Sequence, residues 1–133
     1  MNYIIYTDGG ARGNPGPAGI GVVIYNQHNK TAGRYKQYIG KATNNIAEYR
    51  ALILALEKAA KIGAERLEIR MDSELIVRQM NGQYKIKEPN LKGLASKVLS
   101  LRGKFKNVSF VHILREKNKL ADKLVNEAID EHI

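Results

Sequence analysis

Four acidic residues stand where a carboxylate is costly unless something compensates its charge. Asp8 ends the apolar run YIIYT and Asp72 ends the run LEIRM, while Glu48 and Asp122 lie beside the apolar stripes of two helical segments. A carboxylate at the edge of a hydrophobic core must be paired, hydrogen-bonded or bound to a cation. These four residues, out of only 13 acidic ones, are therefore candidate metal-ligating and catalytic residues.

Each of the four also has a simpler interpretation. Asp8 stands before two glycines, as is common in a turn. Glu48 and Asp72 lie near helix starts, where an acidic residue can cap the helix or interact with its dipole, and Asp122 can be an ordinary half-exposed residue of a helix. The expected topology favours a catalytic role for these residues. Asp8 and Asp72 would end adjacent central strands, and active sites of α/β proteins form at such strand ends. The helices that carry Glu48 and Asp122 can flank that point.

Carboxylates gathered in one pocket repel one another, and hard divalent cations remove that conflict. Mg²⁺ prefers oxygen ligands and keeps several waters, so a few carboxylates and a substrate phosphate suffice. Two such ions roughly 3.5–4 Å apart stabilise both the attacking and the leaving oxygen of a phosphoryl displacement. With no cysteine and only three histidines, the chain suits this mechanism better than a thiol or histidine mechanism.

Hydrophobic periodicity and turn signals predict the elements that must position these residues. Strands are predicted over residues 3–7, 19–26, 32–40, 67–71 and 107–114, with Asp8-Gly9-Gly10 breaking the first. Helices are predicted over 46–63 with Gly63 as C-cap, over 74–82, over 91–102, and near the C-terminal end along the stripe Leu120, Ala121, Leu124, Val125, Ala128 and Ile129. Residues 83–89 form a basic link.

These elements predict an α/β fold. Three neighbouring strands with short links indicate an antiparallel meander, and the alternating helices and strands that follow indicate a mixed sheet with helices on its faces. The length of 133 residues suits a single domain over residues 1–133.

The net charge of +9 favours a polyanionic partner, nucleic acid first, although a basic surface also keeps a protein soluble. The absence of cysteine excludes disulfides and thiolate zinc sites and fits a reducing compartment. No apolar run approaches the ~20 residues of a bilayer span, and the first apolar stretch is too short for a signal peptide. We therefore expect a cytoplasmic protein with no membrane association.

Four motifs resemble those of ribonuclease HI in order and spacing: YTDGGARGNPGPAGIGVVI, TNNIAEYRALILAL, MDSELIVRQMNG and REKNKLADKLVNEA. The resemblance covers essentially the whole chain and is closest to compact members that lack the basic protrusion. It implies a ribonuclease-H-like fold with a five-stranded mixed sheet and helices on both faces. It also implies hydrolysis of the RNA strand of RNA–DNA hybrids with two Mg²⁺, or Mn²⁺ in their place, leaving 3′-hydroxyl and 5′-phosphate ends.

The resemblance gives the acidic residues separate roles. Asp8 would bridge both cations, Glu48 and Asp72 would complete one metal site, and Asp122 would serve the second. In many relatives Gln stands where this chain has Glu74, whose extra charge could weaken substrate binding unless it turns away.

Further residues match substrate contacts of the family. Asn14, Asn44 and Asn45 match positions that read the minor groove of the hybrid, whose width and 2′-hydroxyls suit short polar side chains. Lys41 and Thr43 match a pocket for a phosphate of the DNA strand. Helix capping is the alternative for the stretch 43–45, and both roles can hold together.

Two features leave the family pattern. The histidine of a mobile loop in many relatives is not evident, because His112 falls within a predicted strand and Arg115 lies nearer the expected loop; both are kept as auxiliary candidates. Without the protrusion, Tyr84, Lys85 and Lys87 are candidates to grip the duplex by stacking and phosphate neutralisation. A solvated loop is the alternative.

Three other functions compete. The first is a catalytically weak module that binds hybrid or duplex RNA on the same fold, and the second is another polynucleotidyl transferase of the superfamily. The third is an unrelated enzyme acting on a small phosphate ester, although the chain lacks a Walker-type phosphate loop. We expect RNA–DNA hybrid as the partner, with duplex RNA left open, and a monomer.

Overall fold

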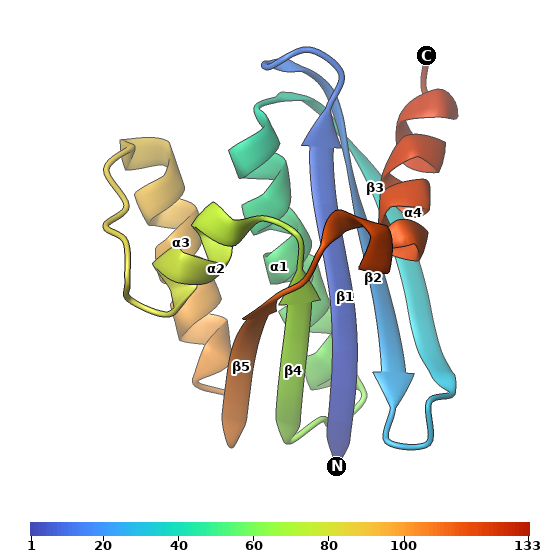
Figure 1. Ribbon diagram of the computed structural model, residues 1–133, viewed down its shortest axis with the longest axis vertical. Coiled ribbons are helices and arrows are strands. Elements are labelled where there is room, and N and C mark those ends of the chain that lie inside the picture. The colour runs from blue at the N-terminus through green and yellow to red at the C-terminus, as the bar shows by residue number, and fades with distance from the viewer.

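A computed structural model describes residues 1–133 and places a five-stranded sheet at the centre of the molecule, in the order β3-β2-β1-β4-β5 (Figure 1). The strands are β1 (Asn2–Ala11), β2 (Gly16–Asn26), β3 (Thr31–Ala42), β4 (Arg66–Met71) and β5 (Asn107–His112). β1 to β3 pair antiparallel, whereas β4 pairs parallel to β1 and β5 parallel to β4. The predicted mixed sheet is confirmed.

Helices cover both faces of this sheet, as predicted. They are α1 (Asn44–Lys61), α2 (Glu74–Met80), α3 (Pro89–Arg102) and α4 (Lys119–Asp130), with a short 3-10 turn η1 (Arg115–Lys117) before the last. In Figure 1, α1 lies behind β1 and β2 with α3 beside it, while α4 crosses in front of β2 and β3. No helix of the chain is both long enough and apolar enough to cross a membrane.

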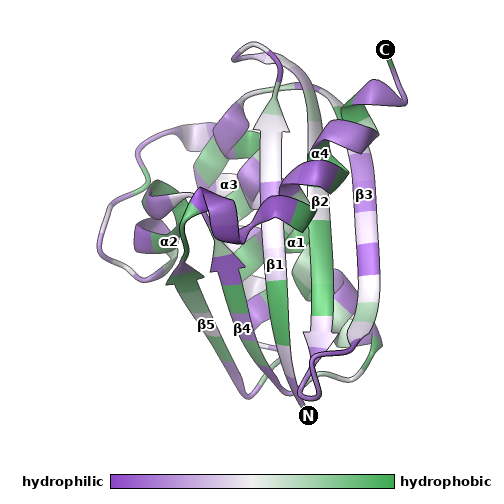
Figure 2. Ribbon diagram, turned by 45° about the vertical axis from the view of Figure 1, so that its right-hand side comes forward, coloured by the Kyte–Doolittle hydropathy of each residue, from purple (hydrophilic) through white to green (hydrophobic).

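The main core lies between the sheet and α1. Ile5, Ile24 and Ile69 from the strands meet Leu52 and Leu56 from the helix, and all five are fully buried. Each such side chain contributes roughly 1.5–3 kcal/mol when it leaves water. Figure 2 shows the contrast between the hydrophobic lower halves of β1 and β2 and the largely hydrophilic edge strand β3. This packing holds α1 firmly against the strand that carries Asp8.

On the other face of the sheet, the packing of α4 depends on a glycine of β2. A Cβ at Gly21 of β2 would overlap the backbone carbonyl oxygen of Ala121 in α4. Because β2 has no side chain there, α4 lies directly on the strand. This close approach brings the first turn of α4, which carries Asp122, to the centre of the sheet.

The first predicted strand boundary was wrong. Asp8, Gly9 and Gly10 do not break β1, which continues to Ala11 in register with β2. The glycines act as contact points for α1 and α4 rather than as a turn. Asp8 is consequently held within a paired strand, with less freedom than a turn residue has.

Other boundaries shift by a few residues. β5 ends at His112, two residues early, where its partner β4 ends at Met71. α2 ends at Met80, and Gly82 with φ +75° lies in the turn that follows. α3 begins at Pro89, because the fixed φ of proline suits the first turn of a helix. α1 ends at Lys61 with Ile62 as its C-cap, so the predicted cap Gly63 lies one residue further on, where its left-handed φ of +72° ends the helix.

Candidate active site

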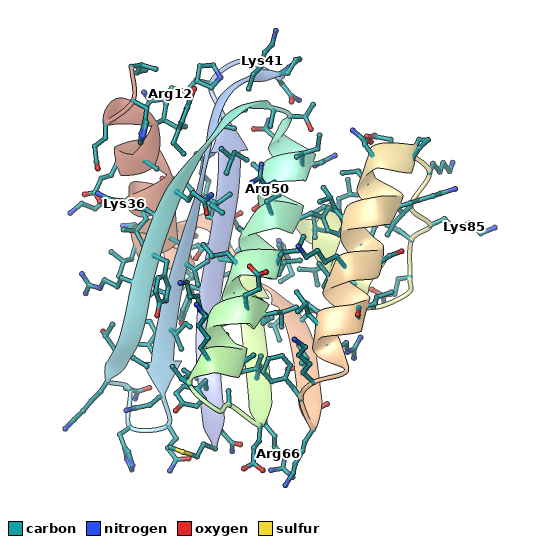
Figure 3. All side chains as sticks on the ribbon, turned by 180° about the vertical axis from the view of Figure 1, so that it is seen from behind. Arg12, Lys36, Lys41, Arg50, Arg66 and Lys85 are labelled. Atoms are coloured by element: carbon teal, nitrogen blue, oxygen red, sulfur yellow. The ribbon has the colours of Figure 1, made fainter.

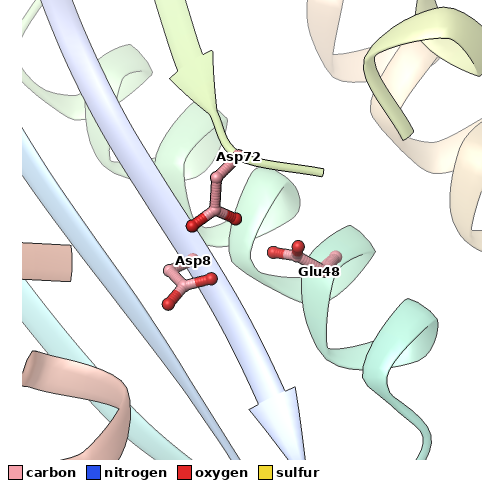
Figure 4. A group of neighbouring side chains, drawn as sticks. All are labelled: Asp8, Glu48 and Asp72. Carbon is pink, nitrogen blue, oxygen red and sulfur yellow. The ribbon is translucent and has the colours of Figure 1, made fainter. Parts of the chain in front are cut away.

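Three carboxylates from separate elements converge at one point. Asp8 comes from the middle of β1, Asp72 follows the end of β4, and Glu48 projects from α1 (Figure 4). One oxygen from each lies within 4.8 Å of the others. All the possible metal-ligand atoms of the group are carboxylate oxygens, with no sulfur or nitrogen among them, so the cluster fits a hard divalent cation.

A backbone contact fixes the position of Glu48. The N–H of Gly9 donates to Glu48 Oε1 at 2.8 Å, and this bond is buried. It forms because α1 touches β1 at Gly9, where a Cβ would overlap the carbonyl of Ala47. Gly9 therefore brings the carboxylate of Glu48 close to that of Asp8.

Gly9→Ala is expected to lower the stability of the protein by about 1–3 kcal/mol, because the new methyl group overpacks a fixed backbone contact. It should also push Glu48 away from Asp8 and weaken Mn²⁺ binding. Urea unfolding and a Mn²⁺ titration measure the two effects. Gly10→Ala is the matched control for stability, since its Cβ would meet Val125 at an ordinary 3.7 Å; equal loss in both variants would contradict the account.

Burial and mutual repulsion dominate the electrostatics of the cluster. Burial raises the pKa of Asp8 to about 8, and the charges of Asp72 and Asp122 add to the rise. Burial, followed by the charges of Asp8 and Asp72, also raises the pKa of Glu48 well above its ordinary value. The cluster therefore resists holding three negative charges unless a cation compensates them.

Asp72 is the least buried member of the cluster. Burial is the main cause that raises its pKa, while hydrogen bonding from Asn118 and the charge of Arg115 oppose that rise. Its position after β4 leaves it half-buried, at the mouth of the site. It can thus face both a bound cation and a substrate.

Asp122 lies at the edge of the same cavity and outside the tight cluster. The cavity has a volume of about 460 Å³ and is lined by Asp8, Glu48, Asp72 and Asp122 together. Asp122 is in the first turn of α4, and its Oδ1 lies 3.9 Å from Arg115 Nη2. All four predicted carboxylates therefore share one cavity.

The two auxiliary candidates lie in different surroundings. Arg115 lines the carboxylate cavity from η1, with its side chain 82% exposed. His112 is the exposed last residue of β5 and does not line the cavity. The geometry thus favours Arg115 over His112 as a group that can reach a substrate.

Asn14 and Asn44 are joined by a hydrogen bond beside the cavity. Asn14 Oδ1 accepts from the N–H of Asn44 at 3.0 Å, and Asn44 Oδ1 accepts from the N–H of Ala11 at 2.8 Å. Neither side-chain NH₂ group makes a hydrogen bond within the protein, so both can donate outward. Thr43 caps α1, its hydroxyl accepting from the N–H of Ile46 at 3.3 Å, so the capping role is confirmed.

The remaining predicted contacts lie to either side. Lys41 is exposed near the end of β3, and Figure 3 shows it at the same end of the molecule as Arg12. Asn45, Tyr84, Lys85 and Lys87 line a second, open cavity of about 530 Å³. Figure 3 shows Lys85 extending from the loop between α2 and α3.

Glu74 turns away from both cavities. It begins α2, is exposed, and has its Oε1 3.8 Å from Nε of Arg78 one turn later. Arg78 in turn lies over the ring of Tyr84, 5.4 Å from its centroid. The extra negative charge of this chain is therefore directed to a neighbouring cation.

Sequence reasoning missed two residues of the site. Arg12 lines the cavity and pairs with Asp130 at 2.6 Å; nothing in its sequence context indicates this. Asn118 is 1% exposed among the carboxylates. Its spacing of four residues before Asp122, one helical turn, was the available signal.

Comparisons with known proteins identify relatives along the whole chain. The family described as "Reverse transcriptase-like" matches residues 6–128. A bifunctional protein of Mycobacterium tuberculosis is 44% identical over 131 residues, covering 98% of this chain and 36% of that protein. Ribonuclease HI of Halobacterium salinarum is 41% identical over 126 residues, covering 95% of this chain and 63% of that protein. The chain thus spans about a third of the mycobacterial relative.

Solved structures show the same architecture. LC11-RNase H1 in complex with an RNA/DNA hybrid has a TM-score of 0.93 and 57% identity, with 97% of each chain covered. RNase H1 of Halobacterium salinarum has a TM-score of 0.96 and 40% identity, covering 98% of this chain and 99% of that one.

Proposed function

Since this chain belongs to the ribonuclease HI family, we propose that it is an endonuclease that hydrolyses the RNA strand of RNA–DNA hybrids. The observation that carries the proposal is the cluster of Asp8, Glu48 and Asp72, whose oxygens lie within 4.8 Å of one another. The hybrid-bound relative at 57% identity supports the choice of substrate. The products would carry 3′-hydroxyl and 5′-phosphate ends.

We propose that the site takes two Mg²⁺ ions, with Mn²⁺ able to replace them. Bound there, the ions would activate the attacking water and stabilise the leaving oxygen. Asp8, at the centre of the cluster, would contact both. Glu48 and Asp72 would hold one ion, and Asp122, across the same cavity, would hold the other.

Arg115 is proposed to contact the phosphate at the cut. Its guanidinium is exposed at the edge of the carboxylate cavity. A planar guanidinium can donate two parallel hydrogen bonds to phosphate oxygens. His112, outside that cavity, is not assigned a role.

Recognition of the hybrid would use both sides of the site. The outward NH₂ groups of Asn14 and Asn44, together with Asn45, would donate to acceptors in the shallow minor groove. Lys41 and Thr43 would hold a phosphate of the DNA strand. The 2′-hydroxyl groups of the RNA provide the difference between a hybrid and duplex DNA.

The loop between α2 and α3 is proposed to extend this grip along the duplex. Tyr84, Lys85 and Lys87 line the same open cavity as Asn45, so the loop and the minor-groove residues can meet one substrate. Arg78 lies over the ring of Tyr84, but the residue is still 47% exposed, so the exposed part of the ring can stack on a substrate. The cavity thereby takes the place of the missing basic protrusion.

The Lys85→Ala/Lys87→Ala double variant should bind hybrid more weakly and keep its turnover number. Each phosphate contact removed reduces the slope of log affinity against log salt by about 0.9 in the B-DNA limit. Binding titrations at several salt concentrations measure that slope. Lys61→Ala/Lys104→Ala, on the surface formed by α1 and α3, is the control; an equal slope in the two variants contradicts the proposed grip.

Cleavage of four labelled substrates tests the proposed function. RNA–DNA hybrid, duplex RNA, single-stranded RNA and duplex DNA are each incubated with Mg²⁺ and with chelator. Metal-dependent cutting of the RNA strand of the hybrid is the expected result, and cutting of duplex RNA as well would broaden the substrate. Binding of hybrid without any cutting in Mg²⁺ or Mn²⁺ would instead favour the catalytically weak binding module.

A further inference from the structure

Asn118 is buried beside the carboxylates without belonging to the metal-ligating set. Only four polar or charged residues of the chain are buried: Thr7, Asp8, Glu48 and Asn118. Asn118 stands at the N-cap of α4, yet its side chain makes no capping hydrogen bond. Its Oδ1 is buried without a partner in the protein, an arrangement that costs stability. Helix capping therefore does not explain an asparagine here.

The side chain of Asn118 forms a hydrogen bond to β1 at the point where the pairing of β1 with β4 ends. Its Nδ2 donates to the carbonyl oxygen of Thr7 at 2.9 Å, across 111 residues of sequence. The ladder between β1 and β4 ends at the pair Tyr6 and Arg70. Asn118 thus bonds the β1 backbone just beyond the end of this ladder, next to Asp8.

The same residue reaches the other two carboxylates. Hydrogen bonding from its side chain opposes the rise that burial causes in the pKa of Asp72. An amide NH₂ has two protons, enough for Thr7 and for Asp72. The backbone carbonyl of Asn118 accepts from the N–H of Asp122 at 3.1 Å and so fixes the first turn of α4.

We propose that Asn118 is a positioning residue: its side-chain amide fixes the β1 backbone next to Asp8 and faces Asp72, and its backbone carbonyl fixes the turn that carries Asp122, so that these carboxylates keep the spacing that a pair of divalent cations requires. It acts through these three residues and is not itself a ligand. The inference rests on the proposed function, because it gives the carboxylates a metal-binding role. Partners that orient metal ligands typically contribute 10–100-fold to metal affinity or activity.

Asn118→Leu tests the role, because leucine keeps the branched arrangement of four side-chain heavy atoms and removes the hydrogen bonds of the amide. Leu124→Ala is the matched control: it loosens the packing of α4 on β2 near Gly21 and leaves Asn118 intact. Calorimetric titration of the metal-free protein with Mn²⁺ is measured with no nucleic acid present, alongside the melting temperature. We expect Asn118→Leu to bind Mn²⁺ about tenfold or more weakly than the natural chain, and Leu124→Ala to bind it nearly unchanged at a similarly lowered melting temperature.

Mn²⁺ affinity within about twofold of the natural chain in Asn118→Leu would overturn the positioning role, while cleavage of hybrid by the natural chain would leave the proposed function standing. Failure of the natural chain to bind Mn²⁺ would overturn both. If Asn118→Leu does not fold, the side-chain NH₂ signals of Asn118 in the natural chain provide the test by nuclear magnetic resonance. These signals should shift together with those of the carboxylates during a Mg²⁺ titration; signals that stay fixed contradict the role.

Discussion

Asp8→Asn should reduce RNA-strand cleavage by about a thousandfold or more. Asp8 is the carboxylate proposed to contact both cations, and its loss removes several kcal/mol of charge stabilisation in the transition state. About 4 kcal/mol corresponds to a thousandfold in rate. Single-turnover cleavage of a labelled hybrid at saturating enzyme measures the chemical step without a contribution from substrate affinity.

The same variant should leave hybrid binding largely intact, because Asn14, Asn44 and the loop residues Tyr84 to Lys87 are unchanged. Asp130→Asn is the matched control: it also removes one carboxylate, but an exposed one paired only with Arg12. A rate within tenfold of the natural chain for Asp8→Asn would contradict the assignment of Asp8.

The metal-free protein should become less stable as the pH rises from about 5 to about 8. Burial raises the pKa of Asp8 from 3.8 to about 8 in the folded chain, so the folded state holds a proton that the unfolded state releases. The stabilisation from this proton is complete below the unfolded pKa of 3.8 and is lost as the pH rises through the folded pKa of about 8. The raised pKa of Glu48 acts in the same direction. The expected loss is on the order of a few kcal/mol.

Urea unfolding in chelator at a series of pH values measures this loss. In Asp8→Asn the free energy of unfolding should depend less on pH. This variant should be more stable than the natural chain near pH 8, because a neutral amide replaces a buried carboxylate that its neighbours repel. Saturating Mn²⁺ should stabilise the natural chain more at pH 8 than at pH 5, because the cation competes with protons for the same oxygens. A metal-free stability that rises with pH over this range would show that the carboxylates do not repel one another as described.

The architecture and the four carboxylates could be predicted because each had a local signal. Hydrophobic periodicity marked the strands and helices, and Asp8 and Asp72 stood out by ending apolar runs. The length of β1 could not be predicted in the same way. In the sequence, the pair Gly9-Gly10 is typical of a turn. Only the folded structure shows that the strand needs glycines there, because α1 and α4 pack closely against them.

Residues that act at a distance were harder to predict. Asn118 bonds Thr7 across 111 positions, and no pattern along the chain shows such a contact. The choice between His112 and Arg115 likewise needed the end of β5 and the path of η1. The grouping of Tyr84, Lys85 and Lys87 with Asn45 around one cavity depends on the packing of α2 and α3, which composition does not specify.

Cations held by these carboxylates are proposed to act directly on the phosphate that is cut. A hybrid in which sulfur replaces one non-bridging oxygen of a single RNA phosphate tests this proposal, because Mg²⁺ prefers oxygen ligands and Mn²⁺ accepts softer ones more readily. Each sulfur diastereomer is compared with the ordinary hybrid in both metals under single-turnover conditions. We expect at least one diastereomer to be cut slowly at that phosphate in Mg²⁺, and Mn²⁺ to restore much of the rate. Equal slowing in both metals, for both diastereomers, would contradict direct contact between the cations and the phosphate.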